Sequence, residues 1–97
     1  MTELQVIARH TIAPGQEDEI RAFYPKLVEA ALTEPGCLAF EAYHRLDDAR
    51  EVVLLERYAS REAFDVHRET SHFKELVLGE IVPRLAHRVV ETYDVAD

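Results

Sequence analysis

Two neighbouring segments of this chain are β-like in composition and apolar on both of their faces. The predicted strand Cys37–Leu46 carries Leu38, Phe40, Ala42 and Leu46 on one face and Cys37, Ala39 and Tyr43 on the other. The predicted strand Glu51–Tyr58 carries Val52 and Leu54 on one side and Val53 and Leu55 on the other. Because helices cover only one face of such a sheet, the other face needs a second cover. We therefore expect a homodimer that packs sheet against sheet, with a monomer covered by its own loops as the alternative.

The first half of the chain contains one more strand and a long helix. Leu4–Ala13 is rich in Val, Ile and Thr and stops at Pro14, which predicts a strand. From Gln16 to Thr33, apolar residues recur at helical spacing, and we expect a kink at Pro25 because proline has no N–H to donate. The residues at 34–36, Glu-Pro-Gly, end this helix. Residues 47–50 have the length and chemistry of a hairpin between the two apolar strands.

The second half predicts two helices and a last strand. Ser60 is placed to cap a short helix through Arg68. Thr70 or Ser71 caps the next helix, in which four apolar residues recur at helical spacing before Pro83: Phe73, Leu76, Val77 and Ile81. The final strand runs from about His87 to Val95. The resulting order, βαββααβ, predicts an α+β fold with a four-stranded antiparallel sheet and its helices on one face.

Composition narrows the class of protein. A chain of 97 residues predicts one domain, residues 1–97, with a modest core. Its formal net charge of -8 makes nucleic acid and anionic lipid improbable partners. No apolar run reaches the length of a membrane span, and no export signal is recognised at the N-terminus. Cys37 is the single cysteine, so we expect a soluble protein of the reducing cytoplasm.

The segment Leu54–Phe73 is the best candidate for a site, because titratable and apolar side chains converge there. It brings Glu56 and Tyr58 at a strand end next to His67 and His72. Neighbouring strand residues point to opposite faces, so Glu56 and Arg57 do not share one site unless the strand bulges. A partly buried structural histidine is the plainer interpretation of His67, and His72 is placed to support a helix start.

Other chemistries have weaker support in the sequence. His67 and His72 are five residues apart, which is not the spacing that places two metal ligands on one helical face, although a joint between two helices would bring them together. We therefore expect no metal. Cys37 is typical of a small buried hydrophobe rather than a nucleophile. With three glycines the chain has no phosphate-binding loop, and His10, His44 and His87 are isolated.

Three stretches resemble the antibiotic biosynthesis monooxygenase domain: EPGC at 34–37, LLERYASREAFDVH at 54–67 and SHF at 71–73. The resemblance spans nearly the whole chain and implies a ferredoxin-like subunit that dimerises into an α/β barrel, with a pocket between sheet and helices. The haem-degrading branch of this family uses Asn, Trp and His at places that Ala8, His67 and Val77 occupy here. Because haem iron needs an axial ligand, we expect no haem and no other bound cofactor.

The resemblance favours a cofactor-independent monooxygenase that acts on a small aromatic or quinol-type substrate with dioxygen. Such a reaction needs a general base, a donor for the developing oxyanion and a dry apolar pocket. We expect His67 to be the base with His72 as second candidate, and Glu56 to orient an imidazole. Tyr58 and Tyr43 are candidate donors or stacking surfaces, and Arg57 or Arg9 would stabilise a phenolate. The expected substrate walls are Phe23, Phe40, Phe64, Phe73 and Leu76.

Two alternatives use the same residues. A dimer that binds a small aromatic or apolar metabolite without turnover needs the same apolar pocket with a few polar groups. An isomerase or processing enzyme for a small signalling molecule would use the same histidine and glutamate side chains as proton shuttles. The sequence does not separate these alternatives from the monooxygenase.

Overall fold

The computed structural model describes residues 2–95, which form one four-stranded sheet in the order β2-β3-β1-β4. The strands are β1 (Leu4–Ile12), β2 (Cys37–Arg45), β3 (Asp48–Tyr58) and β4 (Leu85–Asp94). All three strand pairings are antiparallel. This topology confirms the predicted α+β fold with the ferredoxin-like order βαββααβ.

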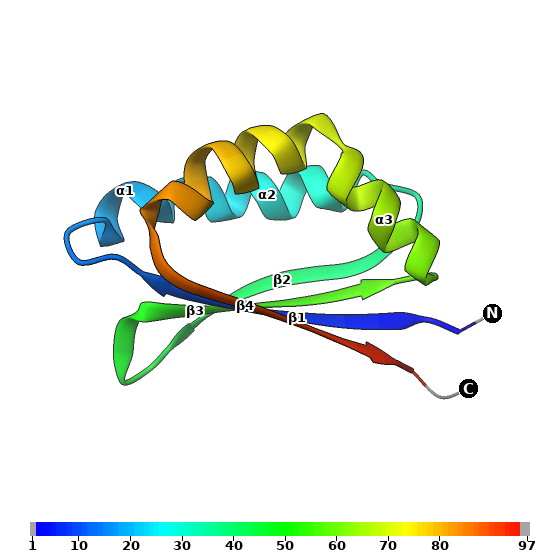
Figure 1. Ribbon diagram of the computed structural model, residues 1–97, viewed down its shortest axis with the longest axis horizontal. Coiled ribbons are helices and arrows are strands. Elements are labelled where there is room, and N and C mark those ends of the chain that lie inside the picture. Colours follow the sequence, from blue (N-terminus) through cyan, green and yellow to red (C-terminus); the bar gives the residue numbers. More distant parts are fainter. Residues whose placement is uncertain (1, 96–97) are drawn as a thin grey trace.

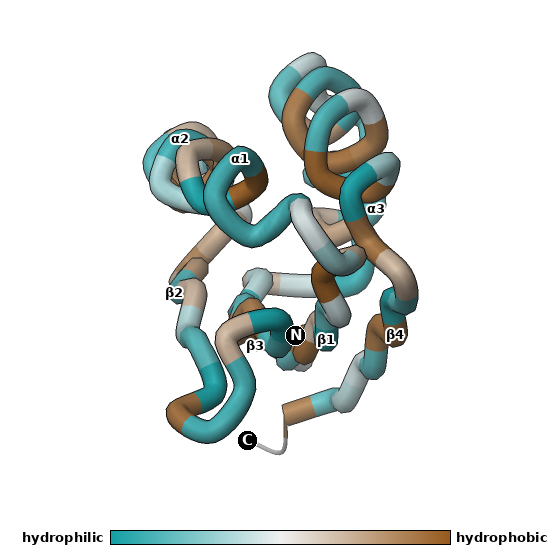
Figure 2. Tube along the Cα trace, turned by 90° about the vertical axis from the view of Figure 1, so that its left-hand side faces the viewer, coloured by the Kyte–Doolittle hydropathy of each residue, from teal (hydrophilic) through white to brown (hydrophobic). Residues whose placement is uncertain are grey.

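The helices all lie on one face of the sheet (Figure 1). They are α1 (Glu17–Arg21), α2 (Phe23–Ala31), α3 (Arg61–Glu69), the π-helix η1 (Phe73–Ile81) and the 3₁₀ turn η2 (Val82–Arg84). Figure 2 shows α1 and α2 above the β2 side of the sheet and α3 above the β4 side. No helix within residues 2–95 has the length and apolar character needed to cross a membrane.

The helix predicted over residues 16–33 is two helices. α1 ends at Arg21, and α2 begins at Phe23. Pro25, in the first turn of α2, has no N–H for the Arg21 carbonyl, and its ring crowds that carbonyl. The proline therefore breaks the helix just ahead of itself, where the sequence predicts a kink.

The joint between α3 and η1 is held by hydroxyl groups. Ser60 Oγ accepts the Ala63 N–H at 3.1 Å and so caps α3, as predicted. Of the two candidates for the next cap, Thr70 has this role, since its hydroxyl accepts the Phe73 N–H at 3.2 Å. The helix that follows is π-helical instead of α-helical, and it buries every fourth residue: Phe73, Val77 and Ile81.

A bulge near Leu38 changes the predicted faces of β2. The register shifts between Cys37 and Ala39, so that Cys37 pairs with Tyr58 and Phe40 pairs with Glu56. Cys37 therefore lies on the helix-covered face together with Phe40, and not opposite to it as the alternation predicts. Leu46 is at the fully exposed hairpin tip and belongs to neither face.

The core lies between the helices and the inner face of the sheet. Along β1, alternate residues are buried: Leu4, Val6, Ala8, His10 and Ile12. In β3 the inner Val52 and Leu54 are buried, whereas the outer Val53 and Leu55 are only half-buried. The outer face of the sheet is thus partly apolar and is not covered by helices.

Candidate active site

A cavity of about 390 Å³ lies between the inner face of the sheet and the helices α3 and η1. Its apolar lining is Val6, Ala8, Leu27, Phe40, Leu54, Phe64, Phe73, Val77 and Val90. Its polar lining is His10, Glu56, His67, Arg68, Arg88 and Thr92. This volume is in the range of small-molecule sites, roughly 300–1,000 Å³. The lining residues contributed by β4 are exposed, so the cavity opens along that edge of the sheet.

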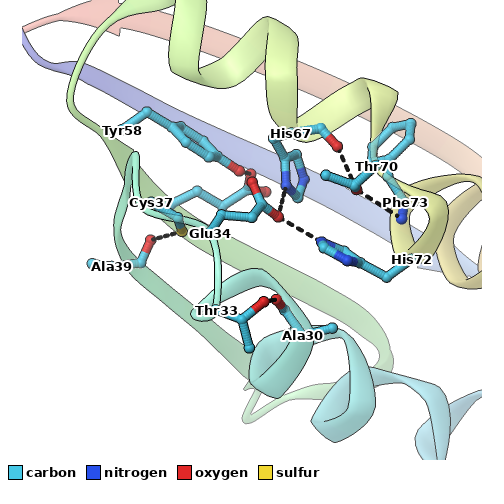
Figure 3. A network of polar contacts seen from close by, with 11 residues as sticks. Ala30, Thr33, Glu34, Cys37, Ala39, Tyr58, His67, Thr70, His72 and Phe73 are labelled. Atoms are coloured by element: carbon cyan, nitrogen blue, oxygen red, sulfur yellow. Dashed lines mark hydrogen bonds and ion pairs between the residues drawn. The ribbon is translucent and has the colours of Figure 1, made fainter.

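Two histidine side chains converge on one carboxylate oxygen of Glu34 (Figure 3). Glu34 Oε2 lies 2.8 Å from His67 Nδ1 and 2.5 Å from His72 Nε2. The side chains of His67, Glu34 and His72 are 2%, 8% and 20% exposed, respectively. Both imidazole rings therefore donate an N–H to a buried carboxylate, and Nε2 of His67 keeps its lone pair free.

A different local structure positions each of these three residues: a tight turn, the end of a helix and the start of a helix. Glu34 follows α2 in a tight turn, and Gly36 lets that turn approach α3, since a Cβ there would lie 2.6 Å from the Ala63 Cβ. His67 lies in the last turn of α3, and His72 is the N-cap residue of η1. The Thr70 hydroxyl donates to the His67 carbonyl at 2.7 Å and holds the joint between them.

The surroundings of His67 favour a neutral imidazole. Burial lowers the pKa of His67 below its usual 6.5, and the hydrogen bond to Glu34 partly offsets this effect. The ring packs among Phe40, Tyr58, Phe64 and Phe73, with centroid distances of 5.2–6.2 Å. A neutral, oriented histidine with one free ring nitrogen is suited to accept a proton at neutral pH.

A second titratable pair lies on the cavity floor. The Tyr58 hydroxyl donates to Glu56 Oε1 at 2.5 Å, and both residues are buried. Burial raises the pKa of Glu56 to about 7, while the Tyr58 hydrogen bond and Arg88 oppose this rise. Burial also raises the pKa of Tyr58, which remains a neutral donor. Glu56 is therefore a carboxyl group able to give or take a proton near neutral pH.

The structure brings several of the predicted site residues together. His67, Glu56, Phe40, Phe64 and Phe73 line the cavity, as expected of a catalytic or binding set. Tyr58 is behind the wall and reaches the cavity through its bond to Glu56. His72 contacts Glu34 and lines an outer groove between the 33–36 turn and α3.

Other predicted site residues lie elsewhere. Tyr43 is half-exposed on the edge strand β2, where it borders a separate groove toward α2, and its pairing with Val53 places it on the outer face of the sheet. Phe23 packs at the edge of the core under Arg84, whose guanidinium carbon is 5.1 Å from the ring centre. Leu76 packs against the core without lining the cavity.

Three predicted roles are corrected by the contacts. Glu56 does not orient an imidazole, because its carboxylate bonds Tyr58 and the imidazoles bond Glu34. Arg9 and Arg57, expected at a phenolate, lie on the outer face and pair with Glu91 and Glu3 at 2.7 and 3.0 Å. Strand alternation sends both arginines away from the cavity.

Sequence reasoning did not assign five polar residues in or next to the cavity to the site: Glu34, His10, Arg68, Arg88 and Thr92. In the sequence, Glu34 indicates only the end of a helix. The packing of its turn against α3 brings its carboxylate to His67. His10 of β1 pairs with Arg88 of β4, and this pairing is predictable only when the order of the strands in the sheet is known.

The cluster of Glu34, His67 and His72 is also compact enough to consider for a metal ion, since one ligand atom from each lies within 4.8 Å of the others. The helix joint overcomes the five-residue spacing of the two histidines. Both nitrogen atoms lie at hydrogen-bond distance from the same carboxylate oxygen, so the contacts present are those of two imidazoles on one carboxylate.

Comparison with known proteins identifies the class. Residues 4–77 match the family model for antibiotic biosynthesis monooxygenase. The chain is 35% identical over 81 residues to the Mycobacterium tuberculosis protein named "Putative monooxygenase Rv0793", a match that covers 81% of this chain and 79% of that protein. This chain therefore belongs to the antibiotic biosynthesis monooxygenase family, which supports a monooxygenase-like role on a small-molecule substrate.

Solved structures agree with this assignment. A crystal structure described as an antibiotic biosynthesis monooxygenase superimposes with a TM-score of 0.90 at 33% identity, covering 97% of this chain and 99% of that one. The structure of Rv0793 from Mycobacterium tuberculosis gives a TM-score of 0.88 at 29% identity, covering 98% of this chain and 96% of that one. The sheet and helices described above are thus the family's fold.

Proposed function

We propose that this chain is a cofactor-independent monooxygenase that oxidises a quinol or polyphenolic small molecule with dioxygen. The observation that carries the proposal is His67 in the cavity wall, with Nδ1 on the buried carboxylate of Glu34 and Nε2 available to a ligand. A phenolate transfers an electron to dioxygen far more readily than a phenol does. A base that deprotonates the substrate in a dry pocket is therefore the main catalytic requirement.

The proposed reaction balances without a further reductant. His67 Nε2 takes the phenolic proton, and Glu34 stabilises the imidazolium that forms. The quinolate passes one electron to dioxygen, and the resulting radical pair combines to a hydroperoxide at a ring carbon. Breaking the O–O bond leaves one oxygen atom on the ring and releases the other as water, with the proton returned by His67. The quinol supplies all four electrons, and the products are a hydroxyquinone and water.

Oxygen consumption tests this function. With a panel of hydroquinones, including a reduced naphthoquinone, uptake above the autoxidation blank is expected, and His67→Ala should lower the rate about 10²- to 10⁴-fold. His44→Ala, outside the cavity, should leave it unchanged. Uptake that vanishes after chelation and returns with Fe²⁺ would instead make the Glu34 cluster a metal centre. Tight quinol binding without uptake would support the non-catalytic binding protein.

One observation favours a second candidate function. Glu56 and His67 are two proton-transfer groups on the walls of the same cavity. An enzyme that moves a proton between two carbon atoms of a carbonyl compound needs such a pair. Exchange of substrate hydrogen for solvent deuterium under anaerobic conditions would identify this isomerase, since the monooxygenase needs dioxygen to turn over.

We also propose that the protein is a homodimer that packs through the outer face of its sheet. That face carries the half-buried Ile7, Val53 and Leu55, and no helix covers it. Exposed Tyr43, Val89 and Tyr93 extend the same apolar area. A second copy packed on this face would bury these apolar side chains.

A further inference from the structure

The cavity has a second polar end, away from His67 and Glu56. In β1, Val6 pairs with Glu56 on one side and Thr92 on the other, whereas His10 pairs with Arg88 of β4. The two levels are four residue steps apart along β1, which corresponds to about 13 Å along the backbone. Both levels line the same cavity.

The stretch between the two ends is apolar. It is formed by Ala8, Leu54 and Val90 from the sheet and by Leu27 and Val77 from the helices. A flat aromatic body of more than one ring fits between such walls. A ligand of this length would have one end at His67 and the other at Arg88.

Arg88 is a cation without an ion-pair partner among residues 2–95, although the chain has a net charge of -8. The other arginine of the cavity, Arg68, is engaged differently: it pairs with Asp65 at 2.5 Å and lies over the Phe64 ring. The charge of Arg88 is felt within the cavity, since it lowers the pKa of both His10 and Glu56. Arg88 also lies outside residues 4–77, so the family match assigns it no role.

His10 gives this end an independent polar feature. Its side chain is only 1% exposed, its Nδ1 lies 2.8 Å from the Tyr24 hydroxyl, and its Nε2 is buried without a partner. Burial and the nearby Arg88 lower the pKa of His10 to about 4, so that the ring is neutral. In the tautomer in which the Tyr24 hydroxyl donates to Nδ1, Nε2 carries a hydrogen that still needs an acceptor.

We propose that Arg88 and His10 form a subsite for an acidic group, and that the substrate is a multi-ring aromatic acid whose phenolic hydroxyl lies at the opposite end, against His67. A carboxylate suits this subsite because a guanidinium binds it through two parallel hydrogen bonds. The inference rests on the proposed function for the role of the phenolic end. The acidic subsite itself does not require catalysis.

A set of naphthalene ligands tests the proposal under anaerobic conditions. 6-Hydroxy-2-naphthoate has its hydroxyl and carboxylate at opposite ends, 3-hydroxy-2-naphthoate has them on adjacent carbons, and 2-naphthol lacks the acid. Naphthalene fluorescence reports binding directly, because the chain contains no tryptophan. The first ligand should bind at least tenfold more tightly than either of the others.

Charge variants assign this preference to the subsite. Arg88→Gln should abolish it, whereas Arg21→Gln removes the same charge at an exposed position outside the cavity and should retain it. Arg88→Lys keeps the charge but not the bidentate geometry, and this variant should retain only part of the preference for the acid. Circular dichroism confirms that each variant is folded.

Three results would overturn the subsite: equal affinity for the three ligands, no binding of any of them, or a preference that survives Arg88→Gln. Failure of the proposed function is distinguishable from these. An intact preference for the acid without oxygen uptake would remove the monooxygenase and keep the subsite. Oxygen uptake with neutral quinols and no preference for acids would keep the monooxygenase and remove the subsite.

Discussion

At the scale of single residues, Glu34 determines what His67 can do. Its carboxylate accepts an N–H from each of two imidazoles, which sets the tautomer of His67 and stabilises its protonated form. We predict that Glu34→Gln lowers kcat of the proposed oxidation about tenfold to hundredfold with little change in KM, because the amide lacks the negative charge. Steady-state kinetics check this, with the exposed Glu62→Gln as control. An unchanged kcat would show that Glu34 only supports the fold.

Two other buried residues give the unfolding free energy opposite pH dependences. The pKa of His10 is lowered from 6.5 to about 4, so its contribution to stability is lost as pH falls through that window. The pKa of Glu56 is raised from 4.5 to about 7, so it destabilises the fold as pH rises through that window. Each effect is on the order of 3 kcal/mol.

Between pH 4.5 and 6.5 the contributions of His10 and Glu56 oppose each other, and His67, whose pKa is also lowered, adds a rise of stability with pH. Glu56→Gln removes the descending contribution, so we predict that the stability of this variant rises more steeply with pH than that of the wild type. Urea unfolding at several pH values measures both profiles. A Glu56→Gln profile no steeper than that of the wild type would contradict the assignment.

At the scale of elements, the site depends on how closely the 34–36 turn approaches α3. Gly36→Ala would place a Cβ 2.6 Å from the Ala63 Cβ, so the helix carrying His67 must move away from Glu34. We predict a loss of about 1–3 kcal/mol of stability, together with a loss of activity. Chemical denaturation and oxygen uptake measure these effects.

The matched control removes the Ala63 Cβ, which is the atom that an alanine at position 36 would clash with. Ala63→Gly alone should cost about 1 kcal/mol as a helix-interior glycine. The double variant with Gly36→Ala should nevertheless be more stable than the sum of the two changes predicts, because the clash is absent. Strict additivity would mean that the contact between turn and helix does not control the site.

At the scale of the whole molecule, the uncovered face of the sheet governs assembly. We predict that the wild type has the mass of a dimer in solution, and that Leu55→Arg, a charge in the middle of that face, yields a folded monomer. Leu78→Arg introduces the same side chain at an exposed leucine on η1 and should leave the dimer intact. Light scattering coupled to size exclusion measures the masses. A wild type of single-chain mass would remove the dimer.

Much of the fold was accessible from local patterns alone. Helical spacing over residues 16–33 and 73–81, the caps at Ser60 and Thr70, and the strand compositions identify the four strands, the helical regions and their order, although not the division into α1 and α2 or the turn η2. These signals depend on residues within a few positions of one another, which is why a single sequence carries them. Their limits are also local: the bulge at Leu38 and the π-helical form of η1 depend on packing against other elements.

The sequence by itself therefore determined the element order, the two-sided apolar strands and His67 as the leading candidate base. Only the tertiary structure decided that Glu34 is its partner, that Glu56 instead binds Tyr58, and that His10 and Arg88 share the cavity. The reason is physical. Glu34 and His67 are 33 positions apart, and His10 and Arg88 are 78 positions apart, so a turn-to-helix contact and the sheet order bring them together, and no local periodicity encodes either. Glu56 and Tyr58 are only two positions apart on one strand face, and the burial of that face by the helices makes them partners.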